Sequence, residues 1–86
     1  MTVRYSRLFV KQFNKQPIKV QQAFYLRLRI FVEDPYNPLL RNHALSGELK
    51  GLYSINVSGD VRAIYEIINN NIYLYQMIGT HSQLYG

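Results

Sequence analysis

The chain has 86 residues, a length that predicts one domain over residues 1–86, and it has no cysteine, which excludes a disulfide framework and a thiolate metal site. Its net charge of +5 favours an acidic partner, either a nucleic acid or an acidic protein, about as much as a basic surface without a specific partner. The sequence has neither an apolar run long enough to cross a membrane nor a signal peptide, so we expect a cytoplasmic protein without a membrane partner.

The first half of the chain predicts a short strand followed by two helices. Residues 2–5 have the pattern of a strand, and Ser6 is a favourable N-cap for a first helix that ends near residue 15. Pro17 can occupy the first turn of a second helix that ends near residue 33, before two Asx-Pro pairs. One apolar stripe runs along this second helix and consists of Val20, Phe24, Leu28 and Phe31.

The second half changes to the two-residue period of strands. Residues 49–58 alternate between apolar and polar side chains, residues 61–68 are apolar on both faces at most positions, and residues 72–78 form a third strand. Turns are expected at 58–60 and 69–71, because Gly and Asn tolerate a positive φ. The predicted architecture is therefore α+β: a short N-terminal strand, two helices and a three-stranded antiparallel meander with the helices on one face.

The meander brings several polar residues to one edge of the sheet. The end of its first strand, the start of the second and the exit of the third meet there. This edge is expected to collect Asn56, Asp60, Arg62 and His81, with Tyr85 just beyond. Asn56 and Arg62 share a face if the turn keeps a simple register, whereas a one-residue bulge would invert this arrangement.

Such a group suits the cleavage of RNA by attack of a ribose 2′-hydroxyl. That reaction needs a base, an acid for the leaving 5′-oxygen, and a cation that stabilises the phosphorane. His81 is suited to proton transfer near neutral pH, and the planar guanidinium of Arg62 matches phosphate oxygens. Tyr85 can stack on a base, and Asp60 can orient a histidine or act as the base itself.

Each of these residues also has a purely structural interpretation. Asp60 suits a Ser-Gly-Asp turn, Arg62 can pair with a nearby glutamate, and Tyr85 can cover the edge of the sheet. A histidine near a chain end is commonly a surface residue. His43 and His81 are the only two histidines, and no acidic cluster accompanies them, which disfavours a metal site.

Four segments carry a family resemblance: HALSG at 43–47, LKG at 49–51, DVRAIY at 60–65 and GTHSQLY at 79–85. Together they resemble the RelE/ParE toxin superfamily, and most closely the YafQ-type mRNA interferases of bacterial type II toxin–antitoxin systems. The resemblance implies a RelE-like fold and an endoribonuclease that cuts mRNA in the ribosomal A site. It also implies a 2′,3′-cyclic phosphate product, no cofactor or metal, and a cognate antitoxin.

The same resemblance assigns catalytic roles to five residues: His43, Asp60, Arg62, His81 and Tyr85. We expect His81 to be the general acid, and the base to be His43 or Asp60. Three further residues are candidate contacts to mRNA or rRNA: Lys50, Ser54 and Asn56.

The chain departs from the family pattern at three positions. Asn56 stands where the YafQ pattern has a further catalytic histidine, and Ser54 and Asn56 occupy the strand on which RelE-type members carry two lysines. Val61 replaces an aromatic residue. These changes make the site less basic, so activity could be lower, or His43 and Asp60 could share the role of base. His43 also precedes the first predicted meander strand, and the sequence does not fix how near it comes to His81.

Two other functions remain open. A ParE-like inhibitor of DNA gyrase would have the same fold, although that branch generally lacks the pair of histidines. A protein that only binds an antitoxin would need no active site. The basic residues before Glu33 suit either rRNA docking or an acidic antitoxin segment that folds on binding; they are Arg4, Arg7, Lys11, Lys15, Lys19, Arg27 and Arg29.

Overall fold

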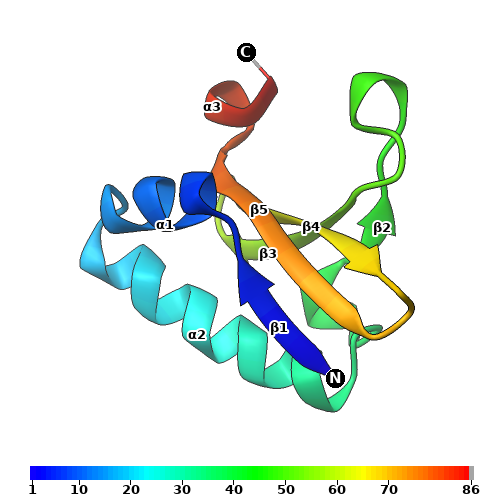
Figure 1. Ribbon diagram of the computed structural model, residues 1–86. Coiled ribbons are helices and arrows are strands. Elements are labelled where there is room, and N and C mark those ends of the chain that lie inside the picture. Colours follow the sequence, from blue (N-terminus) through cyan, green and yellow to red (C-terminus); the bar gives the residue numbers. More distant parts are fainter. Residues whose placement is uncertain (86) are drawn as a thin grey trace.

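The computed structural model describes residues 1–85, which form a five-stranded sheet with two helices packed on one face (Figure 1). The elements in chain order are β1 (Thr2–Tyr5), α1 (Arg7–Asn14), α2 (Ile18–Glu33), β2 (His43–Ala44), β3 (Tyr53–Ser58), β4 (Val61–Ile68), β5 (Ile72–Thr80) and α3 (His81–Tyr85). Short 3₁₀ helices, Pro38–Leu40 and Gly47–Leu49, lie before and after β2. The predicted α+β architecture, with a strand and two helices before a meander, is confirmed.

The sheet is wider than the predicted meander. The strands lie in the order β1-β5-β4-β3-β2, and β3, β4 and β5 form the expected antiparallel meander. β1 adds to one edge, parallel to β5, and the two-residue β2 adds to the other edge, antiparallel to β3. β3 begins at Tyr53 rather than at residue 49, because the 3₁₀ helix and a glycine with positive φ, Gly51 (φ 96°), interrupt the extended chain before it.

The core lies between the helices and the sheet. Phe9 from α1 and Phe24 and Phe31 from α2 are at most 2% exposed, and they meet Ile55 and Tyr75 from the sheet. Burying such a side chain contributes roughly 1.5–3 kcal/mol, so these aromatic contacts dominate the packing. No helix within residues 1–85 combines the length and the apolar character needed to cross a lipid bilayer.

The register of the meander decides which residues face away from the helices. Asn56 pairs directly with Arg62, so the two share a face as predicted, and an irregularity follows only between Asn56 and Ser58. Arg62 in turn pairs with Gly79 of β5. A second irregularity leaves Gln76 without a direct partner in β4, which puts Tyr75 in the core and Met77 on the outer face.

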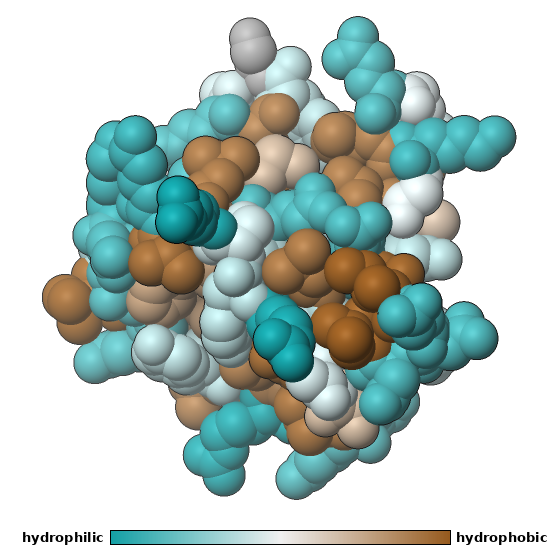
Figure 2. Space-filling model, in the orientation of Figure 1, coloured by the Kyte–Doolittle hydropathy of each residue, from teal (hydrophilic) through white to brown (hydrophobic). Residues whose placement is uncertain are grey.

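The outer face of the sheet is partly covered at one end. The loop of residues 45–52 and helix α3 both project from this face, opposite α2 (Figure 1). Ile64 is fully buried although it does not belong to the core under the helices. Farther along the sheet, apolar side chains gather over the end of the β4–β5 hairpin (Figure 2), where the paired Ile68 and Ile72 are partly exposed.

Candidate functional site

A groove of about 280 Å³ opens on the outer face between α3 and the loop of residues 45–52. Its lining brings together residues from β2, the loop, β3, β4 and α3: His43, Leu45, Ser46, Ser54, Arg62, His81 and Tyr85. Four of the five residues with predicted catalytic roles therefore lie in one groove, although His43 and His81 are separated by most of the second half of the chain.

Arg62 belongs to the sheet that forms the floor of the groove. Its Nη1 donates to the carbonyl oxygens of Gly59 at 2.8 Å and Val61 at 3.1 Å, so the turn before β4 holds the guanidinium. Arginine has five N–H donors, and these bonds use only one of its nitrogens. The floor thus presents a fixed positive charge with donors that match phosphate oxygens. Ser54 lies beside it and is 1% exposed.

His43 stands on one wall of the groove. It pairs with Ser54 across β2 and β3, and its Nδ1 lies 2.8 Å from the carbonyl oxygen of Arg41. Arg41 adopts a left-handed backbone conformation (φ 47°), which is uncommon for a residue other than glycine. Because a carbonyl oxygen only accepts hydrogen bonds, this contact places the hydrogen on Nδ1. A neutral His43 ring therefore carries its free lone pair on Nε2.

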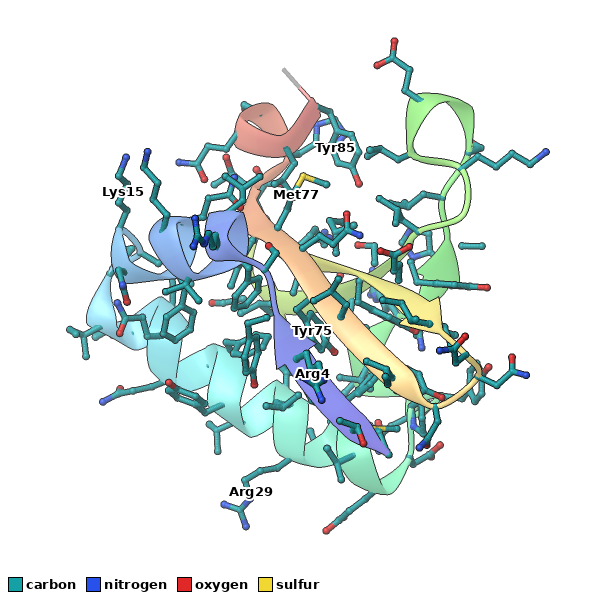
Figure 3. The ribbon with its side chains drawn as sticks, in the orientation of Figure 1. Arg4, Lys15, Arg29, Tyr75, Met77 and Tyr85 are labelled. Carbon is teal, nitrogen blue, oxygen red and sulfur yellow. The ribbon has the colours of Figure 1, made fainter. Side chains whose placement is uncertain are left out.

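His81 and Tyr85 form the opposite wall, on α3. Their ring centroids are 4.6 Å apart, as expected for side chains at positions i and i+4 of a helix. Figure 3 shows Tyr85 on the side of α3 that faces the loop of residues 45–52. α3 is short, so the position of both rings depends on how its first turn is fixed.

That first turn is fixed by two reciprocal hydrogen bonds. The backbone N–H of Thr80 donates to Gln83 Oε1 at 2.8 Å, and the backbone N–H of Gln83 donates to Thr80 Oγ1 at 3.2 Å. This is a capping box. A Cβ on Gly79 would lie 2.8 Å from Gln83 Oε1, so a larger residue at position 79 would displace the Gln83 side chain from its hydrogen bond with Thr80. The motif T-x-x-Q was visible in the sequence, and it would have predicted α3 where a strand exit was expected.

Three predicted site residues do not line the groove. Asp60 is exposed in the turn between β3 and β4, and Lys50 is exposed on the loop. Asn56 is partly buried beside Arg62. Within residues 1–85 no group of three or more histidine, cysteine, aspartate or glutamate residues could hold a metal ion. Leu45 and Ser46 line the groove without having been predicted, because sequence spacing alone did not show where the loop folds.

The comparison with protein families matches all of residues 1–86 to the model described as "Bacterial toxin of type II toxin-antitoxin system, YafQ". The chain belongs to the YafQ toxin family. A search of curated proteins found no match. The resemblance seen in the sequence is thereby confirmed. Membership of this family makes the chain a toxin of a type II toxin–antitoxin system.

Several solved structures share the fold of this chain. YafQ from E. coli strain BL21(DE3) is 19% identical with a TM-score of 0.82, and the match covers 98% of this chain and 97% of that one. A YoeB/ParE toxin from Agrobacterium tumefaciens is 13% identical with a TM-score of 0.78, covering 94% and 99%. The E. coli DinJ-YafQ complex contains a chain that is 22% identical with a TM-score of 0.71, covering 98% and 97%. At these identities the similarity establishes the fold.

Proposed function

We propose that this YafQ-family chain is an mRNA interferase that cleaves mRNA on the ribosome and so inhibits translation. The observation that carries the proposal is the groove, whose lining contains two imidazoles and a guanidinium, those of His43, His81 and Arg62. This arrangement supplies an acid, a base and a fixed cation, which are the three requirements of cleavage by a 2′-hydroxyl.

We assign the base to His43 and the acid to His81. Nε2 of neutral His43 accepts the proton of the ribose 2′-hydroxyl, whose oxygen attacks the adjacent phosphorus. Protonated His81 donates to the 5′-oxygen as its bond to phosphorus breaks. The products are a 2′,3′-cyclic phosphate and a free 5′-hydroxyl, and the chain itself supplies both proton transfers without a metal. Asp60 lies outside the groove lining, and this favours His43 over Asp60 as the base.

The remaining site residues, except Ser54, bind the RNA. Arg62 neutralises charge on the phosphorane through the donors that the turn carbonyls leave unused. Tyr85 stacks on a base beside the cleaved bond. Asn56 contacts the strand beside Arg62, and exposed Lys50 contacts an RNA phosphate from the loop. Ser54 is too deeply buried to contact RNA and instead supports the floor of the groove.

We propose further that the chain acts in the cytoplasm and that a cognate antitoxin neutralises it. The structurally similar E. coli YafQ is known in a complex with DinJ. The first acidic residue of the present chain is Glu33, and seven basic residues precede it, so an acidic antitoxin segment is the complementary partner.

The proposal is tested with purified protein, programmed ribosomes and primer extension on the bound mRNA. Wild-type protein is expected to cut within the A-site codon. His43→Ala and His81→Ala are each expected to slow cleavage by about 10²–10⁴-fold, because each removes one proton-transfer group. Circular dichroism spectra that match the wild type would show that both exposed substitutions leave the fold intact.

Asp60→Asn is the matched control for the base. It is expected to keep most of the activity, and a loss as large as that of His43→Ala would return the role of base to Asp60. A supercoiling assay with DNA gyrase serves as the second control. Poisoning of gyrase without any cut in ribosome-bound mRNA would refute the proposed activity in favour of a ParE-like one.

A further inference from the structure

A second cavity of about 180 Å³ lies at the β2 edge of the sheet, on the helix-covered face and thus on the opposite face from the groove. It is lined by four tyrosines, Tyr36, Tyr53, Tyr65 and Tyr73, together with Asn42 and His43. His43 lines both cavities. β2 forms one edge of the sheet, so the tyrosine cavity and the groove lie on the two faces that meet around this two-residue strand. An RNA strand that crosses β2 therefore reaches both.

The walls of the tyrosine cavity are held by the fold. The Tyr53 and Tyr65 rings stack with centroids 5.3 Å apart and planes 21° apart. The hydroxyl of Tyr65 donates to Asn42 Oδ1 at 2.9 Å, and Asn42 Nδ2 donates to the carbonyl oxygen of Pro35 at 2.9 Å. These bonds tie the loop between α2 and β2 to the sheet, so the cavity is shaped before any ligand arrives.

Among the four tyrosines that line the cavity, Tyr36 does not pack in the hydrophobic core. Its side chain is 80% exposed, more than any other large apolar or aromatic side chain in residues 1–85. Its backbone is nevertheless fixed, because its N–H donates to Asp34 Oδ1 at 3.1 Å. An ordered backbone that presents a free ring at the mouth of an aromatic cavity is an arrangement suited to stacking.

We propose that the tyrosine cavity binds one nucleobase of the mRNA, next to the nucleotides in the groove. This inference rests on the proposed nuclease function and adds a base-binding site to it. The volume is below the roughly 300–1,000 Å³ of pockets that enclose drug-sized ligands, so it suits one ring system rather than a whole nucleotide. Single-stranded bases stack on aromatic side chains, and the second lone pair of Asn42 Oδ1 and the second hydrogen of its Nδ2 can meet a base edge.

The test measures single-turnover cleavage on programmed ribosomes at increasing protein concentrations. Tyr36→Ala is expected to raise the half-saturating concentration roughly 5- to 100-fold, as for loss of one stacked base, with the maximal rate within a few-fold of the wild type. Tyr36→Phe keeps the stacking face and is expected to stay within about threefold. Tyr25→Ala is the matched control, because Tyr25 is an exposed tyrosine that lines neither the groove nor the tyrosine cavity.

Abasic mRNA makes the assignment specific. One abasic position just beyond the nucleotides held in the groove is expected to weaken the wild type as much as Tyr36→Ala does, and to leave Tyr36→Ala unaffected. If the wild type cleaves mRNA and Tyr36→Ala has the same half-saturating concentration, the proposed base site is wrong but the proposed nuclease activity is not. If the cleavage titration of Tyr36→Ala matches the wild type but the variant no longer captures the antitoxin, the tyrosine cavity binds the antitoxin instead of a base. A wild type that cuts no mRNA would overturn both proposals.

Discussion

Tyr75 is fully buried in the centre of the core, between the sheet and the helices (Figure 3). Its ring packs against Phe24 and Phe31, with centroids 5.5 and 5.8 Å away. Its hydroxyl has no hydrogen-bond partner among the described residues. A buried hydroxyl without a partner costs roughly 1–3 kcal/mol, so this one atom opposes the stability that the rest of the ring provides.

Tyr75→Phe is therefore expected to raise the free energy of unfolding by about 1 kcal/mol, because it removes the unpaired hydroxyl and keeps the ring. Urea unfolding measures the effect as a higher midpoint at an unchanged slope. Tyr65→Phe is the matched control with the opposite sign, since the Tyr65 hydroxyl donates to Asn42. It is expected to lower the free energy of unfolding by about 1 kcal/mol. Equal effects from the two substitutions would contradict this account.

At the scale of elements, α3 decides whether the groove has a second wall. α3 has five residues, too few to be stable in isolation, and it contains His81 and Tyr85. The capping box of Thr80 and Gln83, and the contact of Gln83 with Gly79, hold it against the end of β5. Thr80 and Gln83 are thus positioning residues for the proposed acid.

Thr80→Val keeps the shape of the side chain but removes the oxygen that accepts from Gln83, at a cost of about 1 kcal/mol to the first turn. Cleavage that requires a formed α3 is expected to slow by up to about fivefold, with the ribosome affinity little changed. Thr80→Ser restores the acceptor and is expected to restore the rate. Single-turnover cleavage decides the matter: a serine variant as slow as the valine variant would mean that the capping box does not position His81.

The same elements show what the sequence could and could not predict. The core stripe of α2 and the meander follow from local periodicity, which is why both were predicted closely. The two edge strands depend on distant pairing: β1 is held by β5, and β2 has only His43 and Ala44 to pair with β3. A two-residue strand has no detectable periodicity, so the position of His43 in the groove could not be predicted from the sequence. The Arg41 carbonyl that sets its tautomer was equally invisible.

At the scale of the whole molecule, the core is unusually rich in phenols. The chain has eight tyrosines, and Tyr65 and Tyr75 lie in the core with centroids 5.4 Å apart. Burial raises the pKa of Tyr65 from its ordinary value near 10 to about 12, and burial also raises the pKa of Tyr75. The folded state therefore keeps protons that the unfolded chain releases.

This difference predicts that the protein loses stability in alkali. Both folded pKa values lie above the unfolded value, so the stabilising contribution is complete below pH 10 and declines as the pH rises from 10 through 12. For Tyr65 the decline amounts to roughly 2 kcal/mol by pH 12, at 1.36 kcal/mol per pKa unit. Urea unfolding between pH 9 and 12 measures it. The double variant Tyr65→Phe, Tyr75→Phe keeps every lysine and arginine, so their titration cancels in the comparison. The free energy of unfolding of this double variant is expected to fall less steeply with pH than that of the wild type. Parallel curves would show that Tyr65 and Tyr75 do not cause the loss of stability in alkali.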